Sequence, residues 1–179
     1  GKLIISLLND NKILSSESLK QIFSKQWSAD PAMPGMGLGF MQSVIKGQEV
    51  FFHTGDAGQH SLLFLVPQKK IGLYVVYTNI ANGSPKDDLI NFVMNGFSSS
   101  PFKLPSPPAD FAQRAAEYEG NYRSNQYSRT TFEKLGVLPN QFTVSAKPDN
   151  SLFIEMLGGE ISAALIEIKK DLFISSDSA

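Results

Sequence analysis

Phe51-Phe-His-Thr-Gly-Asp56 opens the stretch that decides the fold, and Ser61-Leu-Leu-Phe-Leu-Val-Pro67 and Gly72-Leu-Tyr-Val-Val-Tyr-Thr-Asn79 follow it. These runs are rich in β-branched and aromatic residues, which favour strands. With the runs before them they predict strands at 38–45, 48–53, 61–66 and 71–79. The connections between these strands are short: Lys46-Gly47, Thr54 to His60 and Pro67 to Lys70. Connections of this length predict an antiparallel meander.

Helical patterns flank these strands. Apolar residues at positions 3, 4, 7 and 8 have the helical period, and Ser15 or Ser16 can cap a second helix over Glu17–Phe23. After the strands, Ser84 and Pro85 have the residue types of an N-cap and a first helical position, so a helix is expected over Lys86–Phe97. The first 97 residues therefore predict an α+β unit.

The second half of the chain has a different pattern. Residues 98–109 contain four prolines and four serines, which predicts a linker. A short helix is expected over Phe111–Tyr118, and short strands at roughly ten-residue spacing follow it, which is typical of a sandwich or barrel. These strands are expected at Gly120–Arg123, Thr130–Lys134, Gln141–Ala146, Leu152–Met156, Ala164–Ile168 and Leu172–Ser175. The domains predicted are 1–97, a linker at 98–109, and an incomplete all-β domain at 110–179.

The composition excludes several classes of protein. Apolar residues make up 42% and charged residues 18% of the 179 residues, as in ordinary globular proteins. The 16 basic and 17 acidic residues leave no positive excess for nucleic acid. With no cysteine and only two histidines, neither a disulfide framework nor structural zinc is expected. No cofactor, metal or membrane span is predicted. The chain starts within a helical pattern and stops within a strand pattern, so we expect a piece of a longer protein.

At this point the sequence resembles the serine β-lactamase-like hydrolases, the group of class C β-lactamases, DD-peptidases and related esterases. His53-Thr54-Gly55 looks like the third motif of that family, on a strand beside the active site. The order of this motif, the Val-Pro turn, the next strand and the capped helix carries the resemblance over residues 1–97. Residues 110–179 are similar to the lipocalin-like domain that often follows such hydrolases.

The resemblance implies a C-terminal portion of a β-lactamase/transpeptidase-like domain, with site residues His53, Thr54, Gly55 and Asp56. The Thr54 hydroxyl would meet a substrate carboxylate, and the Asp56 N–H would stabilise an oxyanion. The parent protein would hydrolyse a β-lactam, a D-Ala peptide or an ester through an acyl-enzyme, with a nucleophile and a base outside this chain. A bacterial periplasmic or extracellular location is implied.

Other functions stay open beside this one. A binding protein for a ligand or peptidoglycan could use the same fold without catalysis, and the second domain could be a ligand module. The chain alone is expected to be inactive and to self-associate. The turn from Asp56 to His60 departs from the usual glycine-rich pattern of the family, which puts the substrate class in doubt.

Two motifs of the family occur as letters only. Ser43-Val-Ile-Lys46 spells its nucleophile motif, but the motif needs a helix start, and residues i and i+3 of a strand point to opposite faces. Tyr77-Thr-Asn79 spells its second motif at the end of a core strand. We interpret both as structural. Six aromatic residues are predicted to form the core of the second domain: Tyr118, Tyr122, Phe132, Phe142, Phe153 and Phe173.

Overall fold

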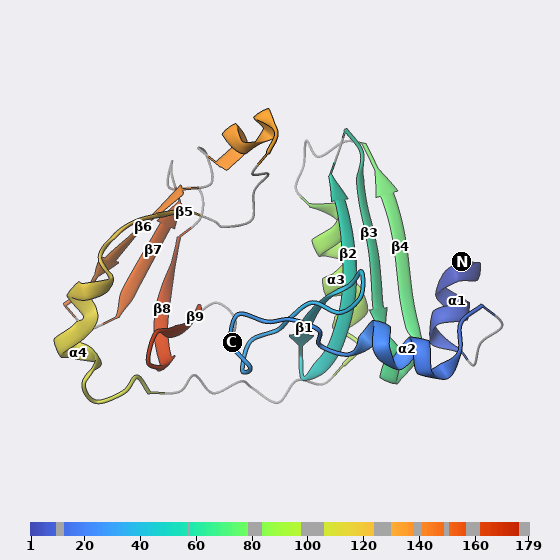
Figure 1. Ribbon diagram of the computed structural model, residues 1–179, viewed down its shortest axis with the longest axis horizontal. Coiled ribbons are helices and arrows are strands. Elements are labelled where there is room, and N and C mark those ends of the chain that lie inside the picture. Colours follow the sequence, from blue (N-terminus) through green and yellow to red (C-terminus); the bar gives the residue numbers. More distant parts are fainter. Residues whose placement is uncertain are drawn as a thin grey trace. The chain divides into compact units, whose positions relative to one another are not determined.

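The chain folds as two compact units in a computed structural model, residues 1–100 and 101–179, each described here by itself. Two antiparallel sheets and a few short helices confirm the α+β class (Figure 1). The structure describes residues 1–9, 13–56, 58–78, 84–97, 106–123, 130–137, 141–148, 151–156 and 162–175. Most of the predicted linker, residues 98–105, lies outside them. No helix in the described ranges is long and apolar enough to cross a membrane.

Unit 1 is a four-stranded antiparallel meander with helices on both faces. Its sheet has the order β1-β2-β3-β4, as the short connections predict. The elements along the chain are α1 (Lys2–Leu8), α2 (Ser16–Phe23), β1 (Met41–Ile45), β2 (Gln48–Asp56), β3 (His60–Val66), a 3-10 turn η1 (Pro67–Lys69), β4 (Ile71–Tyr77) and α3 (Pro85–Met94). The side chain of Ser15 caps α2 by accepting from the Ser18 N–H at 3.1 Å.

The alternation of side chains along the strands separates two cores. On one face Val50, Leu62 and Phe64 are completely or almost completely buried and pack with Met94 of α3. On the other face Phe51 and Leu65 pack with residues of α1 and α2. Successive residues of a strand point to opposite faces, so the continuous apolar run 62–66 of β3 serves both cores.

The loop between α2 and β1 is built on close backbone approaches. A Cβ atom on Gly35 would lie 2.4 Å from the carbonyl oxygen of Trp27, and one on Gly37 would lie 2.3 Å from that of Ile22. Trp27 and Met36 form an antiparallel bridge there. The glycines at 35 and 37 therefore have a packing role, because any side chain there would collide with the backbone.

Unit 2 is a five-stranded antiparallel sheet in the order β5-β6-β7-β8-β9. Its elements are α4 (Phe111–Arg114), η2 (Ala115–Tyr118), β5 (Gly120–Arg123), a 3-10 segment η3 (Phe132–Val137), β6 (Gln141–Ala146), β7 (Leu152–Met156), β8 (Ser162–Lys169) and β9 (Leu172–Ser175). Phe111 and Ala115 pack against buried Val144 and Leu152 of the sheet. The core of unit 2 thus lies between one sheet face and the α4–η2 segment.

A buried ionic network fixes α4 and η2 to the sheet. Glu167 is 0% exposed, and Arg114 donates from Nη1 to its Oε1 at 3.1 Å and from Nη2 to its Oε2 at 2.7 Å. Burial disfavours the charge of Glu167, but the hydrogen bonds from Arg114 and the Asp171 N–H outweigh it and hold the pKa of Glu167 below its ordinary value. The hydrogen bond of Tyr118 to Asp171, with burial, raises the pKa of Tyr118 to about 12.

Several expectations for unit 2 are corrected. The run Thr130–Lys134 overlaps the 3-10 segment η3 and is not a strand. Phe132 is 82% exposed and Tyr122 is 41% exposed, so neither is a core residue, whereas Tyr118, Phe142 and Phe173 pack in the core. The described strands form one sheet and show neither a sandwich nor a closed barrel. The aromatic residue type of Phe132 predicted burial, but Phe132 lies in η3 and not in a strand of the sheet, and its side chain is exposed.

Candidate ligand-binding edge

The last third of β2 borders only one other strand in the described residues. β1 pairs with β2 from Ile45↔Gln48 as far as Met41↔Phe52, whereas β3 pairs along β2 to Asp56↔His60. Residues 53–56 therefore lie at an edge of the sheet. These are the four residues that the sequence singled out: His53, Thr54, Gly55 and Asp56.

The turn between β1 and β2 tells which backbone groups face this edge. Lys46 and Gly47 have φ values of 49° and 71°, as in a two-residue type I′ hairpin. The closing pair Ile45↔Gln48 of such a hairpin exchanges both N–H···O bonds, and alternate residues of β2 then face β1. By this alternation, the N–H and C=O groups of Thr54 and Asp56 face outward at the edge.

The side chains of the four predicted residues divide between the two faces of the sheet. Thr54 and Asp56 share the face that α3 covers, whereas His53 and Gly55 lie on the face of α1 and α2. His53 is exposed and pairs with Leu63. A Cβ atom at position 55 would lie 2.8 Å from the Ser61 Oγ, so glycine leaves room for that serine. The strand therefore does not present the four residues as one cluster.

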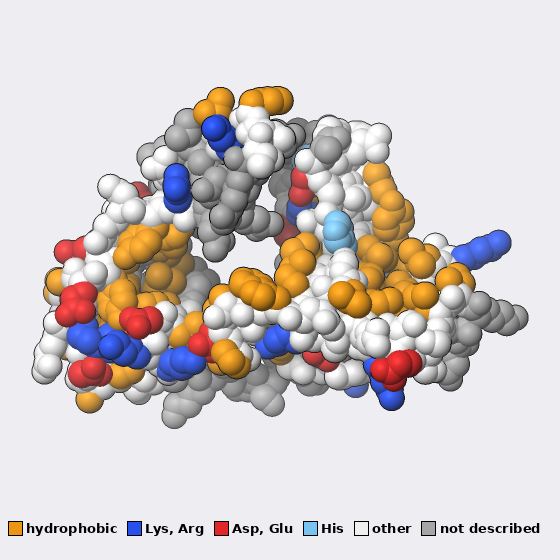
Figure 2. Space-filling view, in the orientation of Figure 1, with side chains coloured by type: hydrophobic (Ala, Val, Ile, Leu, Met, Phe, Trp, Pro, Cys, Tyr) orange, Lys and Arg blue, Asp and Glu red, His pale blue; other side chains and the backbone are white. Residues whose placement is uncertain are grey.

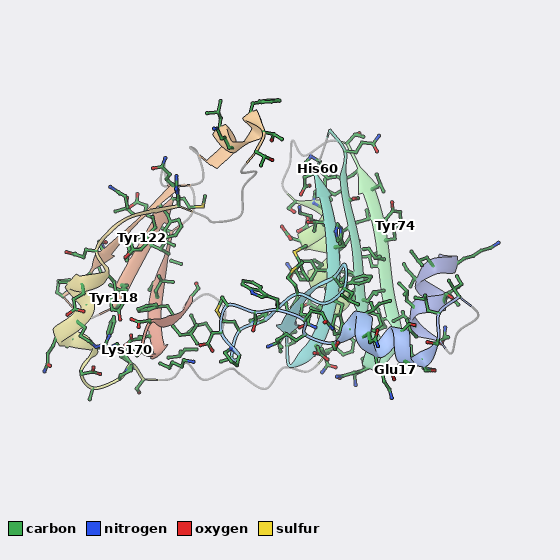
Figure 3. All side chains as sticks on the ribbon, viewed as in Figure 1. Glu17, His60, Tyr74, Tyr118, Tyr122 and Lys170 are labelled. Carbon is green, nitrogen blue, oxygen red and sulfur yellow. The ribbon has the colours of Figure 1, made fainter. Side chains whose placement is uncertain are left out.

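A polar cluster of Asp56, His60 and Lys86 lies beside the edge. Asp56 Oδ1 is 2.6 Å from His60 Nδ1, and Asp56 Oδ2 is 3.5 Å from Lys86 Nζ at the start of α3. His60 also stacks on Tyr77 of β4, with ring centroids 5.1 Å apart (Figure 3 labels His60). The hydrogen bond from His60 and the charge of Lys86 hold the pKa of Asp56 below its ordinary value.

The sequence placed His60 in a loop and left Lys86 outside the site. A signal for His60 was present, because residues four apart around a tight turn can face each other across a hairpin, and Asp56 is the register partner of His60. Lys86 is thirty residues from Asp56 and carries no comparable signal. Only the packing of α3 on the sheet brings it to the carboxylate.

The two letter motifs that the sequence analysis set aside are structural. Ser43 lies in β1, and Lys46 lies in the turn, where its Nζ donates to Asn95 Oδ1 at 2.7 Å. Tyr77 ends β4 and supports His60, whereas Asn79 lies outside the described residues. Ser43 and Tyr77 thus begin their motifs within strands, not at the start of a helix.

The backbone of this edge can pair with an extended chain. Two outward N–H donors and two outward C=O acceptors alternate along it, as on an unpaired edge strand. The described ranges contain no group of three or more metal-ligating side chains.

The comparisons with known proteins show little similarity. No family model matches the chain, and no curated protein matches it. A solved structure described as "Crystal structure of SurE with D-Leu" is similar at 18% sequence identity with a TM-score of 0.49. The match covers 96% of this chain and 39% of that chain, so the chain spans about two fifths of the length of that protein. A likeness at this level assigns neither fold nor function.

The expected membership of the serine β-lactamase-like hydrolases is corrected on these findings. No family model and no curated protein supports that assignment. Acyl-enzyme hydrolysis, and binding by an inactive member of that family, are withdrawn with it. A short motif followed by apolar strands and a helix with a Ser-Pro start is consistent with an antiparallel meander, which is too general a pattern to fix a family. The expected location outside the cytoplasm rested on the same resemblance and stays a prediction.

Proposed function

We propose that unit 1 is a binding module that takes up an extended, peptide-like ligand along the edge of β2 at His53–Asp56. The observation that carries the proposal is that β1 stops pairing at Phe52 while β2 continues to Asp56. An extended main chain can add there as a strand, with hydrogen bonds to Thr54 and Asp56. The ligand class is therefore defined by a repeating amide backbone.

Neighbouring side chains support this use of the edge. Gly55 carries no side chain that could obstruct an approaching chain. Thr54 is partly buried, and its side chain lies on the same face of β2 as that of Asp56. His60 and Lys86 hold the Asp56 carboxylate on the α3 face of the sheet. The carboxylate is thereby balanced by positive charge, so an acidic ligand is not repelled by an isolated anion.

Titration of the full chain with a capped alternating Ala-Val peptide tests the proposal. The amide signals of Thr54 and Asp56 should shift in a two-dimensional NMR spectrum, and those of Gln48 and Val50, which β1 already pairs, should not. A peptide N-methylated at alternate residues cannot donate to the edge and should bind at least about fivefold more weakly, the effect of about 1 kcal/mol for each lost hydrogen bond.

Two substitutions at Asp56 separate backbone from side-chain recognition. Asp56→Pro removes an outward N–H and should weaken peptide binding about fivefold. Asp56→Asn keeps that N–H and the shape of the side chain, so it is the matched control and should retain most of the affinity. Equal binding of the plain and N-methylated peptides, or shifts confined to residues away from β2, would contradict strand addition.

A further inference from the structure

The other edge of the unit 1 sheet is the long strand β4, and no strand in the described residues pairs with its outer side. β4 has seven residues, against five in β1 and four each in β5 and β9, the other strands at the ends of the two sheets. Its sequence Ile-Gly-Leu-Tyr-Val-Val-Tyr contains no charge and no proline. Soluble proteins shorten, charge or bend edge strands because an unprotected edge pairs with another chain. β1 is different, since Met36 and Gly35 already pair with its outer side at Met41 and Gln42.

The side chains on one face of β4 are exposed and apolar. Tyr74 is 59% exposed and Val76 is 45% exposed, although both lie in the middle or second half of the strand. Figure 2 shows hydrophobic side chains along β4, and Figure 3 labels Tyr74 on it. α1 covers only the beginning of this face, where Ile4 and Leu8 contact Gly72.

The hydrogen-bond alternation also fixes which backbone groups of β4 are open. The backbone groups of Phe51, His53 and Gly55 in β2 point away from β1 and toward β3. Their partners in β3 are Leu65, Leu63 and Ser61, so the backbone groups of the alternate residues of β3 point toward β4. Their partners are Ile71, Leu73, Val75 and Tyr77. By the same alternation, the N–H and C=O groups of Gly72, Tyr74 and Val76 face outward.

We propose that two copies of this chain associate through their β4 strands, which pair antiparallel about a two-fold axis at Tyr74. In this register Tyr74 lies opposite Tyr74 of the second copy, and Gly72 lies opposite Val76. All three outward residues of each copy then exchange backbone hydrogen bonds, so the two sheets become one continuous sheet. The interface is isologous, as in most homodimers.

The side chains and charges fit this register. Two exposed tyrosines meet as a cross-strand aromatic pair, and each Val76 lies opposite Gly72, where Ile4 and Leu8 of α1 also pack. The nearest basic residue, Lys70, lies opposite Thr78 of the second copy. The two Lys70 residues are therefore eight positions apart along the strands (78 − 70), roughly 26 Å, beyond the screening length of physiological salt. No like charges are brought together by the pairing.

Cysteine cross-linking of the full chain tests both the pairing and its register. The protein has no cysteine of its own, so a single one reports alone. Tyr74→Cys places the two Cα atoms about 5.5 Å apart in the proposed dimer, within reach of a disulfide. Val76→Cys is the matched control on the same face, because its two copies lie four positions apart, roughly 13 Å, beyond that reach. Mild oxidation should give a covalent dimer of the first variant and essentially none of the second.

Sedimentation gives an independent readout. The wild-type chain should show a concentration-dependent dimer, and Tyr74→Lys should abolish it while its far-UV circular dichroism stays unchanged. Tyr74→Glu should also be monomeric, but a mixture of the two variants should dimerise again. Val44→Lys, at an exposed valine of the opposite edge strand, should leave the dimer intact. A monomeric wild type, equal cross-linking at positions 74 and 76, or loss of the dimer in Val44→Lys overturns the proposal.

Discussion

The two units each carry a carboxylate that contacts a basic side chain, but the two clusters differ in burial. In unit 2, Glu167 is fully buried and accepts two hydrogen bonds from Arg114, whose side chain is 15% exposed. In unit 1, Asp56 is 46% exposed and contacts His60 and Lys86. The residue types are similar, and the pKa of each carboxyl lies below its ordinary value.

Burial decides what each cluster can contribute. Removing one partner of a buried pair leaves a charge that water cannot reach, so the buried cluster is essential to the packing of unit 2. An exposed carboxylate that loses its partner is solvated again at little cost. The cluster of unit 1 therefore stabilises little and stays accessible to a ligand at the neighbouring edge.

Arg114→Met should produce the largest effect. It leaves Glu167 buried without its cation, and we expect unit 2 to lose about 3–5 kcal/mol of its free energy of unfolding. Amide hydrogen exchange of β8 and β9 in the full chain measures this, with the amides of β2 and β3 in unit 1 as the internal control. The double variant Arg114→Met/Glu167→Leu should recover most of the loss. A loss below about 1 kcal/mol in the single variant would contradict a structural role for the pair.

Acid should destabilise unit 2 more than unit 1. Because the folded-state pKa of Glu167 lies below its ordinary value of 4.5, its stabilising contribution is fully present above pH 4.5 and is lost as the pH falls through the lowered value. Unit 2 should open in that acid range. Asp56 shifts in the same direction, but its exposure makes its effect on unit 1 small.

Hydrogen exchange at a series of pH values measures the acid response of each unit. Glu167→Gln should flatten the response of unit 2 below pH 4.5, because the variant has no carboxyl to protonate there. Equal acid sensitivity of the two units, or no change in Glu167→Gln, would show that other carboxyls control the transition.

Tyr118→Phe should have an intermediate effect. The hydroxyl accepts from Arg114 Nη1 at 2.7 Å and donates to Asp171 Oδ1 at 2.7 Å. Its removal should cost unit 2 about 1–2 kcal/mol, since two partners of a partly buried network lose a hydrogen bond. Tyr122→Phe is the matched control, because the Tyr122 hydroxyl makes a single, exposed hydrogen bond, to the Tyr118 carbonyl at 2.8 Å. A larger loss in the free energy of unfolding for Tyr122→Phe than for Tyr118→Phe, measured by denaturant titration, would contradict this role of the network.

Asp56→Asn should have the smallest effect on stability. It removes the charge facing His60 and Lys86 but keeps an oxygen acceptor, so the free energy of unfolding of unit 1 should change by less than about 1 kcal/mol. Hydrogen exchange of the β2 and β3 amides measures it, and added salt should reduce the difference further. A change above about 2 kcal/mol would mean that burial does not distinguish the two clusters.

The sequence by itself determined most of the secondary structure and the pairing of neighbouring strands. Residues at helical spacing, the Ser-Pro start of α3 and the short connections between strands are local signals. They predicted the helices and the meander of unit 1 and all five strands of unit 2, but also a sixth strand at Thr130–Lys134, where the structure has the 3-10 segment η3. The stretch His53–Asp56 was also singled out this way, because a motif is a property of adjacent residues, and its role as a site stays a prediction.

The tertiary structure alone decided which side chains meet across long separations. Lys86 reaches Asp56 from 30 residues away, and Arg114 reaches Glu167 from 53 residues away, through the packing of a helix on a sheet. The open edge at Thr54 and Asp56 depends on where β1 stops, and the exposure of Phe132 depends on where η3 carries it. Such contacts have no local pattern, because they are fixed by the burial of whole elements rather than by neighbours in the chain.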